Sequence, residues 1–426
     1  MAQIDTAGAA TQVDQPMLDR SGVPLKIALA RATRRSRIRT FMLTVPLIAF
    51  VTVFFLLPIG QMLWRSVYND VVASFLPNVT REIAQWEGKD LPDETVFAAL
   101  VADMKQARKD KTIGRVATRV NYDLPGTRSL FTRSARQAKN LTEPPYKQAL
   151  INLDERWGDR ALWTTLKRVS NSIGVGFYVA SLDLKYNADG EIVSQSKDRQ
   201  IYLKLFWRTA WLSALITVIC LFLAYPVAFM LATLPLRYSN LLMIMVLLPF
   251  WTSLLVRTTA WIAILQSQGV LNSLAVWLGI INDEGRMQLI YNQTGTVVAM
   301  THILLPFMVL PLYSVMKTIS PTYVRAARSL GANPFTAFVR VYFPQTVPGI
   351  AAGTLLVFIL AVGYYITPAL VGGQSGQLIS NFIAFHMQRS LNWSFAAALG
   401  ALLLGGVLVL YWLYNRLVGI NNIKLG

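Results

Sequence analysis

The chain has 426 residues, of which 54% are hydrophobic and only 15% are charged, and its mean hydropathy is +0.42. Soluble domains carry about 25% charged residues, so this composition excludes an ordinary soluble protein and indicates a membrane protein. The net charge of +18 is typical of nucleic-acid-binding proteins, but after Ile201 the only acidic residues are Asp283 and Glu284, which suits a segment buried in lipid.

Residues 1–40 begin polar and end basic, and we expect this segment to be disordered and cytoplasmic. The apolar run 41–64 follows at once and is long enough to span a bilayer. The basic flank resembles a signal peptide, but the run is too long and no small-residue cleavage site follows it. We therefore predict a retained first transmembrane helix, with the N-terminus in the cytoplasm because basic residues flank that side.

Residues 65–200 have nearly balanced charges and contain no run that could span a membrane. The stretch 93–109 has a capping acid, an amphipathic pattern and basic residues at its end, which predicts a helix, and 160–173 is a second candidate. The stretch 183–194 alternates around Asn-Ala-Asp-Gly, a hairpin signal. We predict a soluble α+β extracytoplasmic insertion, whose basic residues are compatible with export because long loops translocate regardless of charge.

Five further apolar runs follow, so the fold class is an all-α polytopic membrane protein with six transmembrane helices and the insertion between helices 1 and 2. The predicted helices 2–6 lie in the core 201–426, over 205–234, 241–265, 296–315, 348–371 and 395–417. Six helices return the C-terminus to the cytoplasm. The basic loops 235–240 and 317–340 then fall inside, and 266–295, which holds both acids, falls outside, as the positive-inside rule requires.

The segment 320–344 between the predicted fourth and fifth helices is polar and basic. Ser320 can cap a helix that starts at Pro321, and Gly331 suits the left-handed position that ends a helix. Asn333 can then cap a second helix that starts at Pro334. We expect two short helices joined by a tight bend. An ordinary basic interfacial loop held by anionic lipid is the alternative.

The spacing in this segment resembles the EAA loop of ABC-importer permeases, which is Glu-Ala-Ala, three residues, Gly, and a Pro near the end. The chain departs from that pattern at its first position, where it has arginine. The resemblance implies that the segment is the coupling loop that docks on a separate ATPase subunit, with Arg325, Ala326, Ala327, Gly331, Ala332, Pro334, Phe335 and Pro344 as its residues. The arginine leaves the polar contacts of that docking open.

The stretches 247–265, 363–373 and 381–400 resemble the spermidine/putrescine-type subfamily of these permeases. The resemblance implies a transmembrane permease subunit of an ATP-driven importer in the bacterial inner membrane. Its expected partners are an ABC ATPase dimer that carries ATP and Mg²⁺, a second permease subunit, a periplasmic substrate-binding protein and the lipid bilayer, with no nucleic acid. A polyamine is the expected substrate, with an opine, another amine conjugate or an oxyanion as alternatives.

We expect the translocation path to include aromatic side chains that attract a cationic substrate, together with one arginine: Trp251, Arg257, Trp261, Tyr364 and Tyr365. Aromatic belts or helix packing are the alternative. Arg257 lies about 25 Å of helix beyond Asn240 if that helix is continuous, so it would be near the outer face, where it either snorkels or lines the path.

The sequence contains no Gly-x4-Gly-Lys-[Ser/Thr] and no Gly-x-Ser-x-Gly motif, so we expect no bound cofactor, no ATP site and no enzymatic activity in this chain. Its two histidines, 302 and 386, are far apart in sequence, so we expect no metal site. The single cysteine, Cys220, is interpreted as a small buried hydrophobe. A membrane-anchored receptor or scaffold that works through 65–200 is a less favoured alternative.

Overall fold

The computed structural model describes residues 25–418, so the disorder expected for 1–24 lies outside the described residues. The chain divides into two compact units, 1–62 and 63–426. The described chain begins with α1 (Leu25–Val51), which continues through the π-helical segment η1 (Thr52–Leu56) into α2 (Leu57–Val67). The last residues of α2 belong to the second unit, and Arg37–Val67 qualifies as a membrane span. Residues 25–40 are therefore helical and not disordered. Alanine and arginine, which are frequent there, are both good helix formers.

The insertion, at the start of the second unit, is a bundle of short helices. Its elements are α3 (Val71–Phe75), α4 (Pro77–Gln85), α5 (Glu94–Lys109), α6 (Ile113–Asp123), α7 (Thr127–Gln137), η2 (Ala138–Asn140), α8 (Tyr146–Leu153), η3 (Glu155–Gly158), α9 (Arg160–Ser170), α10 (Gly176–Ser181) and η4 (Lys197–Arg199). The predicted helices 93–109 and 160–173 correspond to α5 and α9.

The α+β class predicted for the insertion is wrong. The predicted hairpin exists as β1 (Leu184–Tyr186) paired antiparallel with β2 (Ile192–Ser194), but this two-stranded sheet is the only sheet among the described residues. The Asn-Ala-Asp-Gly turn thus specifies one local hairpin. The segments around it follow helical periodicity and fold as helices.

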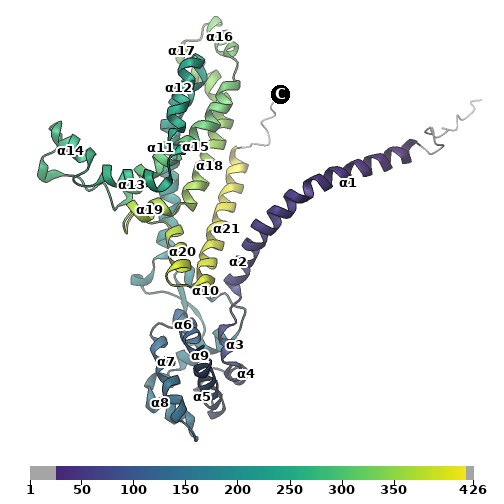
Figure 1. The fold of residues 1–426 in the computed structure, drawn as a ribbon, viewed down its shortest axis with the longest axis vertical. Helices are drawn as coiled ribbons and strands as arrows, with labels where there is room; N and C mark the ends of the chain where they lie inside the picture. The colour runs from purple at the N-terminus through teal and green to yellow at the C-terminus, as the bar shows by residue number, and fades with distance from the viewer. Residues whose placement is uncertain (1–24, 419–426) are drawn as a thin grey trace, which may run out of the picture. The chain divides into compact units, whose positions relative to one another are not determined.

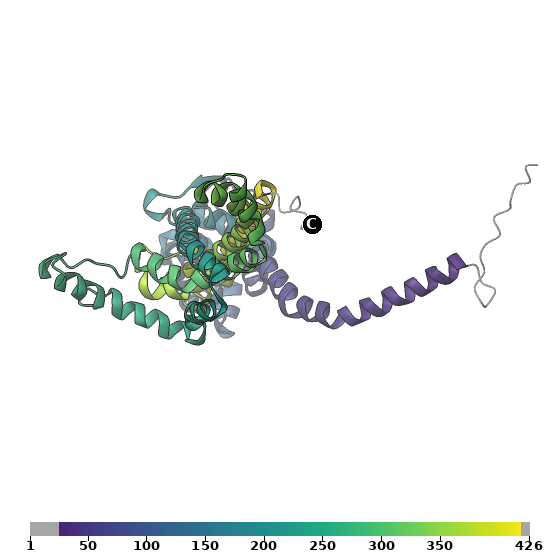
Figure 2. The same cartoon turned by 90° about the horizontal axis from the view of Figure 1, so that it is seen from above.

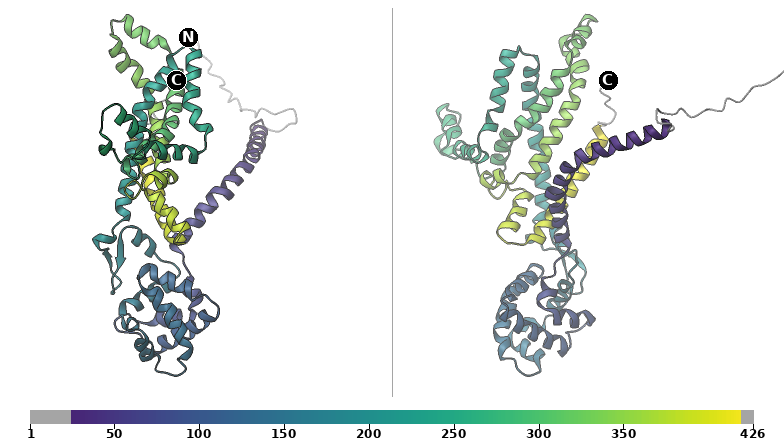
Figure 3. Two further views of the ribbon diagram at one scale, coloured as in Figure 1. Left: turned by 60° about the vertical axis from the view of Figure 1, so that its left-hand side comes forward. Right: turned by 45° about the vertical axis from the view of Figure 1, so that its right-hand side comes forward.

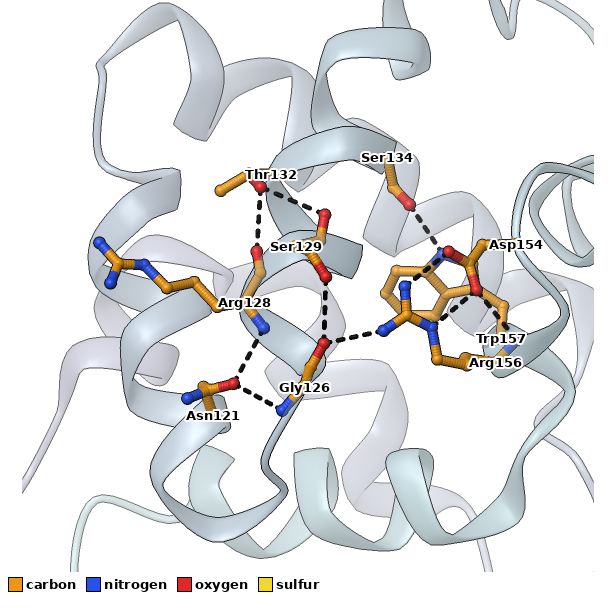
Figure 4. A network of polar contacts seen from close by, with 9 residues as sticks. All are labelled: Asn121, Gly126, Arg128, Ser129, Thr132, Ser134, Asp154, Arg156 and Trp157. Atoms are coloured by element: carbon orange, nitrogen blue, oxygen red, sulfur yellow. Dashed lines mark hydrogen bonds and ion pairs between the residues drawn. The ribbon is translucent and has the colours of Figure 1, made fainter.

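Two tryptophans form the centre of the insertion's own hydrophobic core. Trp157 and Trp163 are completely buried, and their ring centroids are 5.7 Å apart. The indole N–H of Trp157 donates to Ser134 Oγ at 2.9 Å, so its polar atom is satisfied (Figure 4). Figure 4 also shows Arg156 bridging from Asp154 to the carbonyl of Gly126. The insertion therefore has the buried core and the polar cross-links of an ordinary folded domain.

Four long helices form the membrane core: α11 (Tyr202–Thr233), α15 (Gln293–Thr318), α18 (Phe343–Gly363) and α21 (Trp393–Val418). Cys220, in α11, is fully buried against α15, as predicted. Small residues let α18 approach α15 closely, because a Cβ at Gly353 would lie 2.7 Å from Met308 Sδ. The insertion and α16 (Pro321–Ser329) lie at opposite ends of this second unit (Figures 1 and 3).

The third predicted helix, 241–265, is not continuous. It is divided into α12 (Leu236–Leu247), a 3₁₀ turn η5 (Leu248–Trp251) and α13 (Leu254–Leu265), which is followed by α14 (Val270–Trp277). The two halves meet at 98°, so the described residues hold five candidate membrane spans, or six if this bent pair counts as one. Pro249 lies at the break, where it lacks the N–H that a continuous helix needs. Figures 1 and 2 show α13 and α14 extending away from the bundle.

The fifth predicted helix, 348–371, starts earlier and breaks sooner than expected. It begins with α17 (Pro334–Ala337), passes through the π-helical segment η7 (Phe338–Tyr342) into α18, and stops at Gly363. After a break, α19 (Ile366–Val371) and α20 (Ile379–Gln388) follow, and His386 lies in α20. The second short helix expected at 334 is thus the start of this span.

Candidate functional site

The bend between α16 and α17 has the geometry that the sequence predicted. Ser320 Oγ accepts from the amide of Thr322 at 3.4 Å, and Asn333 Oδ1 accepts from the amide of Thr336 at 2.7 Å, so both helices are capped. Gly331 has φ +90°, the left-handed conformation that glycine adopts without steric cost. These contacts fix the angle at which the chain leaves α16 and enters the next membrane span.

The outer surface of this bend carries exposed apolar side chains. Leu330 is 89% exposed, Phe335 is 76% exposed and Tyr323 is 56% exposed. Large apolar side chains grouped at the tip of a polar element mark an interaction surface. Ala327 and Ala332 are half-buried on the inner side, and Arg325, Ala326, Gly331, Pro334 and Pro344 are exposed.

A cavity of about 590 Å³ lies beneath the bend, between α16, α17 and the ends of α11 and α15. It is bordered by aromatic rings that connect the bend to α11. Phe338 packs edge-on against Phe229, with ring centroids 5.9 Å apart, and stacks on Tyr342 at 5.7 Å. These rings place η7, which follows α17 directly, in contact with α11.

The broken helices meet on the side of the core away from α16. Thr258 in α13 lies 3.4 Å, between hydroxyl oxygens, from Thr367 in α19. The backbone carbonyls freed where α18 breaks are satisfied by side chains, since Ser380 Oγ donates to Tyr364 O at 2.6 Å and Asn381 Nδ2 donates to Tyr365 O at 2.7 Å. Irregular backbone at membrane depth is tolerated where it is buried in protein or lines a cavity.

Three of the five predicted path residues lie together beside this break. Trp261 Nε1 donates to His302 Nδ1 at 3.2 Å, and Arg257 is in electrostatic range of both His302 and Tyr364. Arg257 Nε is buried and has no hydrogen-bond partner among the described residues. The estimate of about 25 Å of helix between Asn240 and Arg257 does not hold, because the helix is broken between them.

Residues 206–419 match the family model described as the inner membrane component of binding-protein-dependent transport systems. The chain belongs to this family. The match covers the core after the insertion, and the family description, together with the candidate spans, makes this a multi-pass inner membrane protein.

Curated relatives of this inner membrane component carry the same core. The spermidine/putrescine transport system permease protein PotB of Haemophilus influenzae is 35% identical over 221 residues, which cover 51% of this chain and 77% of the relative. PotB of Escherichia coli is 34% identical over 221 residues, covering 51% and 80%. Among solved structures, a bacterial ABC transporter involved in the import of the acidic polysaccharide alginate matches with a TM-score of 0.46 and 20% identity, over 54% of this chain and 81% of that one.

The other two residues predicted for the translocation path, Trp251 and Tyr365, are not part of the Trp261–His302 pair. Trp251 is 74% exposed in η5, and Tyr365 lines a separate cavity of about 460 Å³ with Asn381 and Arg389. Neither His302, the partner of Trp261, nor Asn381 was predicted as a site residue from the sequence. Asn381 lies 16 residues after Tyr365, so no local signal in the sequence links the two.

Proposed function

We propose that this chain is the permease subunit of an ATP-driven importer of polyamines of the spermidine or putrescine type. The observation that carries the proposal is the 34–35% identity to the PotB permeases over 221 residues of the core. The capped bend at Gly331, with apolar side chains exposed around it, supports a docking role for that end of the bundle.

In this proposal α16 and α17 face the cytoplasm and dock on an ABC ATPase, which alone binds ATP and Mg²⁺. The N- and C-termini are cytoplasmic, and the insertion is extracytoplasmic. Closure of the ATPase dimer moves α16, and the rings of Phe338 and Phe229 pass this movement to α11. The six helices, with the bent pair counted as one span, then form half of a pathway in the type I importer arrangement, and a second permease subunit supplies the other half.

A periplasmic binding protein delivers the substrate to the end of the core where the broken helices meet. Among the described residues of the candidate spans no acidic side chain is present, so the pathway offers a polycation aromatic rings and backbone carbonyls instead of a fixed counter-charge. Substrate selectivity then depends mainly on the binding protein.

A substrate that carries a carboxylate as well as an amine, such as an opine, is the second candidate. Arg257 favours it, because its guanidinium lies beside the break and its buried Nε has no partner among the described side chains. An arginine at this position attracts a carboxylate and repels a polyamine.

The experiment is to purify the chain from its host with its companion proteins, reconstitute the complex in vesicles, and measure ATP hydrolysis and uptake. The proposal expects an ATPase and a second permease to co-purify, and spermidine or putrescine with its binding protein to stimulate hydrolysis. Stimulation by an opine and not by polyamines would move the substrate to the second candidate. If no ATPase co-purifies, the permease function itself is contradicted.

A further inference from the structure

A cavity of about 380 Å³ lies at the neck where the chain enters and leaves the insertion. Two short segments run side by side there: the amide of Asn69 donates to Ser172 O at 2.7 Å, and the amide of Gly174 donates to Val67 O at 2.9 Å. The cavity is far larger than the roughly 10–15 Å³ that one water molecule needs. Its charged lining comes from α6 and α9 of the insertion.

The charges that line this neck cavity do not balance. Arg119, Lys167 and Arg168 are cationic, and Asp123 is the only carboxylate among the described residues that line it, so the net charge is +2. Lys167 Nζ donates to the carbonyl of Trp86, which is neutral. Burial lowers the pKa of Arg168 more than the nearby Asp123 raises it, which is the mark of a cation without full compensation.

The two arginines contact aromatic rings as well as the carboxylate. The guanidinium of Arg119 lies 4.6 Å from the ring centre of Phe177, and that of Arg168 lies 4.2 Å from that of Tyr186. Their contacts to Asp123 are 3.3 Å from Arg119 Nη1 to Oδ1 and 3.6 Å from Arg168 Nη2 to Oδ2. Both are longer than the 2.7–2.9 Å of a charge-assisted hydrogen bond.

Several of these buried polar atoms have no hydrogen-bond partner in the described part of the chain. They are Nε and Nη1 of Arg119, Nε of Arg168 and Oδ2 of Asp123. The Arg119 side chain is only 10% exposed, and leaving a buried polar group without a partner is destabilising. The unpartnered N–H groups of the two arginines are donors that a bound anion would satisfy, whereas the unpartnered Oδ2 of Asp123 is an acceptor and would not be satisfied by it.

We propose that the neck cavity binds a phosphate group, supplied either as inorganic phosphate or by the headgroup of an anionic phospholipid. A net charge of +2 matches phosphate better than a single carboxylate. The planar guanidinium groups of Arg119 and Arg168 offer the paired donors that phosphate oxygens accept. Asp123 is within ion-pair distance of both arginines, so it offsets their mutual repulsion when no anion is bound, and its own charge weakens the binding of an anion.

Binding of an anion at this site would stabilise the contacts between the insertion and the membrane core. Arg119 belongs to α6 of the insertion, and its partner Phe177 in α10 packs against Phe395 in α21, with ring centroids 6.5 Å apart. Tyr122, also in α6, donates to the carbonyl of Ser390 at 3.0 Å. An anion held by α6 and α9 therefore stabilises helices that contact the core directly.

The test uses the full-length chain in detergent and phosphate-free buffer, with calorimetric titration of sodium phosphate against sodium chloride at matched ionic strength. We expect one phosphate per chain and a higher unfolding temperature in phosphate. Arg168→Gln should weaken binding by about tenfold or more, because it removes a charged donor pair. Arg156→Gln, which removes an ion-paired arginine elsewhere in the insertion, should bind as the unaltered chain does.

Asp123→Asn separates a binding site from a purely structural ion pair. As the carboxylate opposes the anion, this variant should bind phosphate more tightly, although it unfolds at a lower temperature in chloride. A structural ion pair predicts the lower stability with no gain in phosphate binding, and that result would overturn the proposal. Because this readout does not depend on Arg168, it holds even if Arg168→Gln fails to fold.

The source of the phosphate group is tested with vesicles of phosphatidylglycerol in phosphatidylcholine, compared with phosphatidylcholine alone. Stabilisation by phosphatidylglycerol that Arg168→Gln abolishes, without any response to inorganic phosphate, identifies a lipid headgroup as the ligand. A response to inorganic phosphate identifies the free ion. If neither exceeds its control, or if Arg168→Gln responds as the unaltered chain does, the cavity is not a phosphate site.

Discussion

The amide of Ala332 donates a hydrogen bond to the carbonyl of Ala327 across the bend at Gly331, with 3.1 Å between nitrogen and oxygen. The amide of Gly331 donates to Arg328 O at 3.0 Å. Together these bonds form a Schellman motif, which closes a helix on a left-handed residue. The spacing of four residues from Ala327 to Gly331 thus has a local physical reason: it places the glycine where the motif needs a positive φ.

Replacement of Gly331 by alanine should impair coupling and barely affect the fold. Its φ is +90°, where an L residue costs roughly 1–2 kcal/mol, and a Cβ there would meet nothing within 4 Å. The strain would be relieved by a change in the angle of α16. We expect lower substrate-stimulated ATP hydrolysis in the reconstituted complex at a nearly unchanged unfolding temperature.

Gly279→Ala is the matched control for this change. Gly279 has φ +70°, also has nothing within 4 Å of its Cβ position, and lies beyond α14, away from the bend. Both variants carry similar backbone strain, so only the first should reduce ATP hydrolysis. Equal activity in the two variants would show that the bend has no part in coupling.

Local signals in the sequence predicted this element well. Ser320, Gly331 and Asn333 determine caps and a bend through contacts within a few residues, and the structure has each of them. The Asn-Ala-Asp-Gly hairpin was predicted for the same reason, and so was Cys220 as a buried side chain in the apolar core.

Most of the features that the sequence did not predict depend on distant contacts. The break after α12 is an exception, because it lies at Pro249, a residue that disrupts helices, and the high mean hydropathy of the run gave no sign of it. The break after Gly363 is stabilised by Ser380 and Asn381, whose role is apparent only when α20 is folded against it. The insertion was predicted as α+β because one hairpin was given too much weight among segments with helical periodicity.

Asn381→Leu should destabilise the core by about 2–4 kcal/mol. The amide group of Asn381 donates to Tyr365 O at 2.7 Å and accepts from the amide of Leu378 at 2.9 Å, and each buried partner left unsatisfied costs about 1–3 kcal/mol. Ser380→Ala, which removes one bond to Tyr364 O, should cost about 1 kcal/mol. Thermal unfolding in detergent measures both.

Ser129→Ala removes an exposed serine bond of 3.2 Å in the insertion and serves as the control, with an expected change within about 0.5 kcal/mol. The expected order is therefore Asn381→Leu, then Ser380→Ala, then Ser129→Ala. If Asn381→Leu were as stable as the control, the polar contacts at the break would have no structural role.

The stability of the unaltered chain should fall as the pH falls from about 6.5 towards 5. Burial lowers the pKa of His386 from 6.5 to about 4, so between these values the unfolded chain binds a proton that the folded chain does not. The sign follows directly: stability is fully present above pH 6.5 and decreases as the pH falls. The ring of His386 packs against Phe395 with centroids 4.8 Å apart, and protonation would place a charge there.

His386→Gln should flatten this dependence, measured as unfolding temperature against pH between 7 and 5. The chain has only one other histidine, so His302→Gln is the natural control and should retain the slope due to His386. A slope that persists in His386→Gln would assign the pH dependence to other groups.

Arg325→Glu should leave the fold intact and weaken the docking of the ATPase. Arg325 is exposed on α16 and has no ion-pair partner among the described residues, so its replacement should change stability by no more than about 0.5 kcal/mol. The cavity beneath it is also lined by Lys317 and Arg328, and the described residues that line it include no carboxylate. A partner surface that fits this element should therefore present carboxylates, which would be repelled by the new glutamate. We expect the affinity for the ATPase to fall by about five- to tenfold at low salt, equivalent to roughly 1–1.4 kcal/mol, and the difference to shrink as salt screens it.

Arg237→Glu, which changes an exposed arginine at the start of α12, is the control and should leave this affinity unchanged. Equal or tighter binding by Arg325→Glu would mean that the partner is not acidic at this point, and that Arg325 contributes through its aliphatic stem or not at all.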